Sequence, residues 1–270
     1  LHLDEDFVLD KIKQFLQQHP KHKLKLMQAK QFAQLRKSKF VDDIVKFVRK
    51  EAREVYGLFM TPEISKMVKY LEQLAKAKGT TSALLHDLHK KLLKIHLSTK
   101  ERLGLYPDLY KDLFAITGKP KKILDLGCGF TGISLFFSGI KNISYVGCEF
   151  NQQDVDVLNH YFKIIGKISS VKGKAIKLNL MKHPKNVAKY KADVVFIFKL
   201  FDILDNKINE IIMKNLKSKW IVVSFPRKTV GKRVMKQQRR AGFQKMLRRL
   251  GYEYETLTYP NELFYIVKNK

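Results

Sequence analysis

A glycine-rich segment, Asp125-Leu126-Gly127-Cys128-Gly129-Phe130-Thr131-Gly132, follows a short apolar run and precedes an amphipathic one. Gly127 and Gly129 carry no Cβ, so the backbone there can turn sharply and approach a ligand closely. A dinucleotide enzyme would hold a pyrophosphate at such a loop. Asp125 stands directly before the glycines, where a carboxylate can accept a hydrogen bond from an ammonium group. This acidic residue therefore favours S-adenosylmethionine (SAM), which has no phosphate, over a nucleotide.

Glu149 and Asn179 extend this candidate cofactor site. Glu149 ends the next apolar run, where a carboxylate can grip a ribose diol by accepting two hydrogen bonds. We expect the adenine near Asn179 and Leu180, in the loop after the third strand, because a side-chain amide both donates and accepts. The alternatives are an ordinary tight turn beside an unrelated glutamate, and a solvated loop asparagine. The loop, its strand context and Glu149 together favour SAM binding.

The segment Ser98-Thr99-Lys100-Glu101-Arg102 lies upstream of the glycine-rich loop. Ser98 and Glu101 have the spacing of a capping box, which predicts the start of a helix. The cap does not account for Arg102, whose guanidinium is a fixed fork of donors suited to the carboxylate end of SAM. His96 precedes the segment, and we assign it to packing or solvent rather than to catalysis.

Positive charge dominates the composition, with 53 Lys and Arg against 25 Asp and Glu and a net charge of +28. Such a field attracts polyanions, and nucleic acid is favoured over an anionic membrane. Residues 227–249 hold ten basic residues and no acidic one, and residues 21–39 form a second basic stretch. A solvated face is the alternative, but a long run of one sign favours a surface that tracks phosphates. The predicted RNA contacts are Lys21, Lys23, Lys25, Arg227, Lys228, Lys232, Arg233, Lys236, Arg239 and Arg240.

Two strand ends carry the candidate catalytic residues, because chemistry in a doubly wound sheet lies past the carboxyl ends of the strands. Lys199 stands alone between apolar residues, where it would contact RNA phosphate or a base acceptor, or simply snorkel at the surface. At the second end, Phe225 offers a stacking face for a flipped base and Pro226 stiffens the loop. Ser224 and the carbonyl of Phe225 are possible hydrogen-bond acceptors for a base amine.

The elements that must position these residues change in character along the chain. Residues 1–105 show the hydrophobic spacing of helices and predict a helical N-terminal domain. In residues 106–270, apolar runs of strand length alternate with longer amphipathic stretches, which predicts a parallel sheet covered on both faces. The last two runs, 252–258 and 263–267, predict a hairpin. The predicted fold is α/β, a Rossmann-like class I SAM-dependent methyltransferase with an all-helical N-terminal domain.

Several functional classes find no support in the sequence. Cys128 and Cys148 are the only cysteines, and neither belongs to a cluster with zinc-finger spacing. We therefore expect no metal and two small buried cysteines. No secretory signal and no apolar stretch of about 20 residues is present, so we expect a cytoplasmic protein without membrane association. We further expect a monomer.

The chain resembles the aminoglycoside-resistance 16S ribosomal RNA methyltransferases, the guanine-N7 group that acts in the decoding site. The resemblance implies that residues 1–105 form a helical RNA-docking domain, and that the assembled small ribosomal subunit, with its 16S rRNA, is the substrate. It also implies that Arg102 holds the SAM carboxylate, that Glu149 holds the ribose, and that Lys199 lies near the transfer site. Family members commonly carry Asp at the positions of Glu149 and Asn179. The matching blocks are residues 60–63, 96–103, 197–200, 223–226 and 261–265.

The methylated atom stays open between two bases. Guanine N7 has an in-plane lone pair, so alignment with the methyl group and sulfur of SAM supplies most of the acceleration. Cytosine N4 would instead need acceptors, and Ser224-Phe225-Pro226 partly matches the loop of amino-methyltransferases. The resemblance favours guanine N7, and cytosine N4 in the same rRNA region is the alternative. A non-catalytic RNA-binding factor for ribosome assembly and a small-molecule methyltransferase are two further hypotheses, and a housekeeping role stands beside antibiotic resistance.

Overall fold

The computed structural model describes residues 5–20, 39–52, 66–77, 79, 81–227 and 240–269. The chain divides into two compact units, Leu1–Met60 and Thr61–Lys270. Helices between residues 66 and 102 therefore belong to the same unit as the sheet, whereas the sequence predicts a domain boundary at residues 105 and 106. No helix in the described ranges is both long and apolar enough to cross a membrane.

The first unit contains the helices α1 (Glu5–Gln18) and α4 (Lys39–Ala52). They pack through Phe15, which is buried and whose ring centroid lies 5.3 Å from that of Phe47. Val48 is also buried, so apolar side chains of the two helices meet. The predicted RNA contacts Lys21, Lys23 and Lys25 lie outside the described residues.

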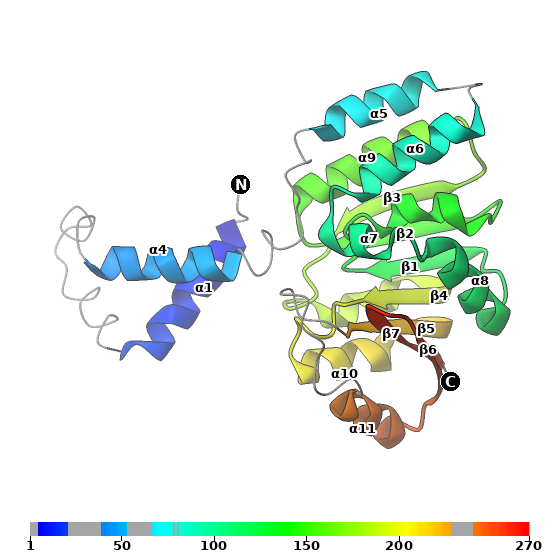
Figure 1. Ribbon diagram of the computed structural model, residues 1–270. Coiled ribbons are helices and arrows are strands. Elements are labelled where there is room, and N and C mark those ends of the chain that lie inside the picture. The colour runs from blue at the N-terminus through cyan, green and yellow to red at the C-terminus, as the bar shows by residue number, and fades with distance from the viewer. Residues whose placement is uncertain are drawn as a thin grey trace. The chain divides into compact units, whose positions relative to one another are not determined.

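The second unit is built on a seven-stranded sheet of order β3-β2-β1-β4-β5-β7-β6 (Figure 1). The five strands β1 to β5 pair in parallel, β7 pairs antiparallel with β5, and β6 and β7 form the predicted hairpin. This confirms the Rossmann-like methyltransferase fold. The strands are β1 (Lys122–Leu126), β2 (Ser144–Glu149), β3 (Lys172–Lys177), β4 (Lys191–Phe198), β5 (Lys217–Pro226), β6 (Glu253–Thr258) and β7 (Glu262–Lys268).

Helices cover both faces of the sheet, as a parallel sheet requires. One face carries α8 (Tyr106–Thr117), the 3-10 helix η3 (Thr131–Ser138) and α9 (Gln152–Ile165), with α5 (Met67–Lys76) on α9 and α6 (Ser82–Leu93) on η3. The opposite face carries the 3-10 helix η4 (Pro184–Lys189), α10 (Asn206–Asn215) and α11 (Ala241–Leu250) around an apolar cluster. The short α7 (Leu97–Arg102) lies beside the carboxyl ends of the central strands (Figure 1).

Candidate functional site

The glycine-rich loop connects β1 to η3 in a tightly packed turn. Gly127 has φ +62° and Gly129 has φ +44°, a left-handed conformation that favours glycine. The amides of Gly127 and Cys128 both donate to the Cys148 carbonyl, at 2.8 and 3.1 Å. A Cβ on Gly127 would lie 2.8 Å from Leu200, and a Cβ on Gly129 would lie 3.0 Å from the ring of His96. Both glycines are therefore required, as the sequence predicts.

His96 packs against this loop rather than facing solvent. Its ring lies 5.6 Å from that of Phe130 and is nine-tenths buried. Burial, with the nearby charges of Arg102 and Lys199, lowers the pKa of His96 to about 3. The imidazole is therefore neutral at physiological pH, which agrees with its assignment to packing.

Gly129→Ala tests whether this loop must stay open. The added methyl group meets His96, and alanine at positive φ costs on the order of 1–2 kcal/mol. We expect a lower melting temperature and a loss of affinity for S-adenosylhomocysteine of at least about tenfold, measured by calorimetry. Gly139→Ala, at φ +64° with open space around the Cβ, is the matched control. Unchanged affinity in Gly129→Ala would contradict a ligand site at this loop.

Asp125 is fully buried at the end of β1. Its Oδ2 accepts a hydrogen bond of 2.8 Å from the Tyr145 hydroxyl, and its Oδ1 has no hydrogen-bond partner among the described residues. Burial raises the pKa of Asp125 to about 7, against the opposing hydrogen bond from Tyr145. A buried acceptor without a partner is costly. The arrangement suits a ligand that brings its own cation, such as an ammonium group.

Glu149 ends β2, as predicted, but part of its hydrogen-bonding capacity is used within the protein. Its Oε2 accepts from the Gly129 amide at 2.9 Å, and its Oε1 accepts from the Phe150 and Asn151 amides at 2.7 and 3.4 Å. A carboxylate has about four lone-pair sites, so one remains for a diol. Asn179 accepts from the Lys182 amide through Oδ1 at 3.0 Å, and the neighbouring Leu180 is buried. The ribose and adenine contacts stay predictions.

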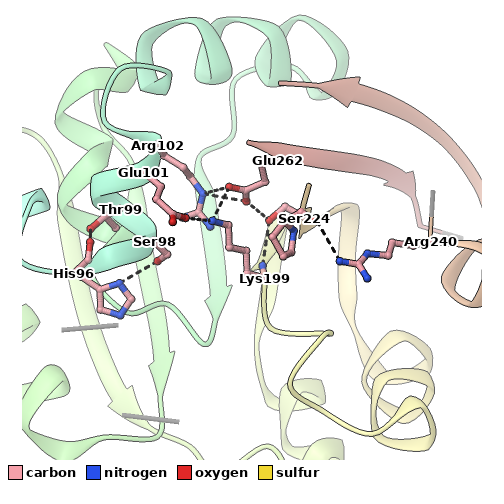
Figure 2. Close-up of polar contacts among 10 residues, drawn as sticks. His96, Ser98, Thr99, Glu101, Arg102, Lys199, Ser224, Arg240 and Glu262 are labelled. Atoms are coloured by element: carbon pink, nitrogen blue, oxygen red, sulfur yellow. Dashed lines mark hydrogen bonds and ion pairs between the residues drawn. The ribbon is translucent and has the colours of Figure 1, made fainter. Parts of the chain in front are cut away.

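The predicted capping box at the start of α7 is wrong. His96 is the N-cap of α7 and makes no capping hydrogen bond through its side chain. Ser98 Oγ instead pairs with His96 Nδ1 at 3.0 Å, and Glu101 pairs with Lys199 Nζ at 2.6 Å (Figure 2). The first contact lies within the start of α7, and the second joins α7 to Lys199 at the end of β4.

Glu262 links the polar groups at the centre of the site, although the sequence did not single it out as a functional residue (Figure 2). Its carboxylate is fully buried at the start of β7 and receives Arg102 Nε at 2.8 and 3.0 Å. Ser224 Oγ donates to the same group, and Lys199 Nζ lies 3.5 Å away. Burial opposes ionisation, but Arg102 and Lys199 hold the pKa of Glu262 below its usual value. One buried carboxylate therefore organises two cations and a hydroxyl.

Arg102 is almost fully buried, and Glu262 uses only part of its hydrogen-bond donors. Its guanidinium carbon lies 4.9 Å from the ring centroid of Phe198, and only Nε is used by Glu262. Nη1 and Nη2 are buried and have no hydrogen-bond partner in the described part of the chain. Two unpaired donors on one planar group match the two oxygens of a carboxylate, so the geometry fits the role expected for Arg102.

Lys199 is held in place at the tip of β4 and is not a snorkelling surface lysine. Its φ is +58°, an uncommon conformation for a residue other than glycine, and such strain is concentrated at functional sites. The backbone amide donates to the carbonyl and the hydroxyl oxygens of Ser224, at 3.0 and 3.1 Å. Its ammonium group lies between Glu101 and Glu262 and is 11% exposed. A cation is thus fixed at the carboxyl end of β4.

Ser224 and Phe225 point to opposite faces of β5. Ser224 is fully buried on the face of Glu262, whereas Phe225 is 3% exposed and packs 5.1 Å from the ring of Phe243. The prediction that Phe225 offers a stacking face to a flipped base is therefore wrong. Alternation along the strand places its ring in the core under α11. Pro226 ends the strand, and its carbonyl accepts from Arg240.

Two of the RNA contacts predicted after β5 lie in the described ranges, and both make polar contacts within the protein. Arg227 Nη1 donates to the Tyr259 carbonyl at 2.8 Å, and Arg240 pairs with Asp202 at 2.8 Å. The other predicted contacts of this segment lie outside the described residues: Lys228, Lys232, Arg233, Lys236 and Arg239. Their role in RNA binding stays a prediction.

Cys128 and Cys148 are buried, as predicted. Burial raises the pKa of the Cys148 thiol to about 12, so it behaves as a small apolar side chain. Within the described ranges, no group of three or more His, Cys, Asp or Glu residues is arranged to hold a metal ion.

Comparison with known proteins places this geometry in context. Residues 30–266 match the family described as ribosomal RNA methyltransferase (FmrO). The 16S rRNA (guanine(1405)-N(7))-methyltransferase of Proteus mirabilis is 26% identical over 202 residues, which cover 70% of this chain and 69% of the relative. Its counterpart from Micromonospora echinospora is 25% identical over 239 residues, covering 84% and 83%.

Solved structures are similar over nearly the whole chain. The 16S rRNA methyltransferase RmtF, in complex with S-adenosyl-L-homocysteine, superposes with a TM-score of 0.69 at 21% identity and covers 99% of this chain and 100% of its own. The 16S rRNA methylase RmtB superposes with a TM-score of 0.65 at 22% identity, covering 98% and 90%. These similarities support the fold described above.

Proposed function

The chain belongs to the ribosomal RNA methyltransferase (FmrO) family, and we propose that it transfers the methyl group of SAM to N7 of a guanine in the decoding region of 16S rRNA. The relatives from Proteus and Micromonospora carry this activity in their names. The observation that carries the proposal is a pair of buried groups without hydrogen-bond partners among the described residues, the Nη atoms of Arg102 and Oδ1 of Asp125, at one end of a methyltransferase sheet.

The residues present fit SAM. Arg102 would hold the carboxylate and Asp125 the ammonium group, so each unpartnered buried atom gains a partner of complementary charge. Glu149 would accept from the ribose, and Asn179 with Leu180 would border the adenine. When bound, SAM supplies an electrophilic methyl group on a sulfonium. The protein contributes alignment of the target base, because guanine N7 needs no deprotonation.

One observation argues against cytosine N4 as the acceptor. Ser224 was the candidate acceptor for a cytosine amine, but its hydroxyl donates to Glu262, accepts from the Lys199 amide, and is fully buried. Phe225 offers no exposed ring beside it. Lys199, in contrast, is a fixed donor near the surface, suited to the O6 acceptor beside N7 on guanine.

Transfer of a labelled methyl group tests the proposal. Small ribosomal subunits and naked 16S rRNA are incubated with the protein and labelled SAM, and the modified nucleoside is mapped by mass spectrometry. We expect 7-methylguanosine in the decoding region, with the assembled subunit as the better substrate. A methylated cytidine would overturn the base assignment, and no incorporation into either substrate would reject the proposed activity.

Asp125→Asn should separate stability from cofactor affinity. The folded-state pKa of Asp125, about 7, lies above its ordinary value of 3.8. Its contribution to stability is therefore complete below pH 4 and is lost as the pH rises through about 7. At pH 8 we expect Asp125→Asn to melt higher than the wild type and to lose affinity for S-adenosylhomocysteine by about tenfold or more.

Calorimetry across pH 6–8 checks the same group in the wild type. An ammonium group binds the ionised form of Asp125, so affinity for S-adenosylhomocysteine should tighten as the pH rises towards about 7 and then level off. Asp125→Asn should lose this dependence. A variant that binds as tightly as the wild type would contradict the ammonium contact.

A further inference from the structure

A cleft of about 450 Å³ lies between α10 and α11, on the sheet face opposite to the glycine-rich loop. Its floor is apolar and consists of Phe201, Phe243 and Met246, which are buried in the core. The rings of Phe201 and Phe243 meet at 5.9 Å. The cofactor contacts proposed above use none of these residues, so the cleft is a separate feature of the molecule.

Charged groups surround this apolar floor. Arg240 pairs with Asp202 at 2.8 Å, and Arg249 pairs with Glu210 through two contacts of 2.5 and 2.9 Å. The exposed Lys207 and Lys245 add positive charge beyond these two pairs. Four cations against two carboxylates leave the rim positive, so the cleft favours an anionic or phosphorylated occupant.

One buried polar group in the wall lacks a partner. Asn209 is 3% exposed, and its Nδ2 donates to the Phe201 carbonyl at 2.9 Å. Its Oδ1 is buried without a hydrogen-bond partner in the described part of the chain. The wall of the cleft thus holds an unused acceptor, which a donor on an occupant would satisfy.

The cleft is connected through β5 to the polar group around Glu262. Phe225 lines it, whereas the preceding Ser224 touches Glu262 on the other face of the strand. Arg240 donates to the Pro226 carbonyl at 3.2 Å, and its guanidinium carbon lies 5.1 Å from the ring centroid of Phe225. An RNA strand whose target base enters the proposed site past the end of β5 would therefore place its next nucleotides within reach of this cleft.

We propose that the cleft between α10 and α11 is a second RNA subsite, which takes one nucleotide of the strand that carries the modified base. The inference rests on the proposed function. Extrusion of a target base removes a stacking partner from its neighbours, and unstacked nucleotides bind where an apolar surface adjoins cations. The volume suits a single small ligand, and the net charge of +28 favours RNA over a protein segment as its source.

Site-specific cross-linking identifies the occupant. Ala241, exposed at the rim of the cleft, is changed to cysteine and coupled to an azidophenacyl photo-cross-linker. The two natural cysteines are buried, which directs the reagent to residue 241. We expect a cross-link to 16S rRNA within a few nucleotides of the modified base in small subunits. Lys163→Cys, exposed on α9, is the control and should give none at that position.

A cross-link from residue 241 to a ribosomal protein would overturn the proposal, and so would none at all with a labelled protein that still binds the subunit. The readout does not depend on methyl transfer. A protein that transfers no methyl group but cross-links to decoding-region rRNA would contradict the proposed function and keep the subsite.

Filling the cleft gives an independent measurement. A Cβ on Gly242 meets no atom within 4 Å, so Gly242→Trp places a large side chain in the cleft without displacing the core. We expect KM for small subunits to rise about tenfold, with affinity for S-adenosylhomocysteine unchanged. Lys163→Trp, on the distant α9, should leave KM unchanged. Wild-type kinetics in a correctly folded Gly242→Trp protein would overturn the proposal.

Discussion

Arg102→Lys is expected to leave the protein folded and to reduce its affinity for S-adenosylhomocysteine roughly 100-fold or more. Lysine keeps a positive charge beside the buried Glu262, which now receives Arg102 Nε at 2.8 and 3.0 Å. It cannot also present the two donors that Nη1 and Nη2 hold unpaired. Hydrogen bonds to charged groups contribute about 1.5–3 kcal/mol each, so losing two of them accounts for the expected change.

Arg102→Met separates this effect from simple loss of charge. Methionine leaves the Glu262 carboxylate with Lys199 as its remaining cation, at 3.5 Å, and breaking a buried pair costs about 3–5 kcal/mol. Calorimetry and thermal melting should therefore rank the variants differently, with Arg102→Met far less stable than Arg102→Lys. Arg249→Lys, which alters an exposed pair, is the matched control. Wild-type affinity in Arg102→Lys would remove Arg102 from the cofactor site.

Most of the sheet could be predicted because its strands are buried on both faces. β1 and β4 are nearly continuous apolar runs, and hydrophobic periodicity detects such runs directly. The edge strand β3, Lys172–Lys177, consists of lysines around Gly173, Ala175 and Ile176, so its local pattern does not indicate a strand. It is a strand because it pairs with β2 along six residues, and that pairing is not visible in local sequence.

The candidate site was predictable where it depends on one loop and less so where it depends on distant pairs. The spacing of Gly127 and Gly129 predicts the tight turn after β1, because a turn depends on neighbouring residues alone. Glu262 lies 160 residues from its partner Arg102, and no periodicity relates them. Its one local signal is an acidic residue at the start of a strand that is otherwise apolar up to Lys268. The contact of Glu101 with Lys199, 98 residues away, was mispredicted for the same reason.

Glu262 also connects the residue proposed to hold the cofactor with the residue proposed to contact the target base. Arg102 and Glu101 are neighbours on α7, and Arg102 pairs with Glu262 while Glu101 pairs with Lys199 (Figure 2). In the proposed function, Arg102 would hold the cofactor and Lys199 would contact the target base. Glu262 contacts both cations. A change at Glu262 should therefore affect both cofactor binding and methyl transfer, whereas a change at Lys199 should affect methyl transfer alone.

Lys199→Met is expected to bind S-adenosylhomocysteine like the wild type and to lose methyl transfer by about 100-fold or more.

Glu262→Gln should then be the most damaging conservative change in the site. It keeps the shape of the side chain but removes the negative charge between Arg102 and Lys199, which leaves Lys199 paired with Glu101, whose side chain is 41% exposed. Uncompensated buried charge costs about 3–5 kcal/mol. Thermal and denaturant unfolding should show this loss, together with loss of both S-adenosylhomocysteine binding and methyl transfer.

A double-mutant cycle distinguishes a charge network from ordinary packing. In Glu262→Gln the Lys199 ammonium loses its buried carboxylate partner and destabilises the fold. Adding Lys199→Met should therefore restore about 1 kcal/mol of stability, although each change alone destabilises or is neutral.

The charge of Glu262 also makes the free energy of unfolding depend on pH. The lowered folded-state pKa of Glu262 contributes stability above its ordinary value of 4.5, and this is lost as the pH falls through the folded-state pKa. The wild type should therefore lose this contribution below pH 4.5, and Glu262→Gln should not. Additive effects in the cycle, or identical acid unfolding of the two proteins, would show that Glu262 does not act through its charge.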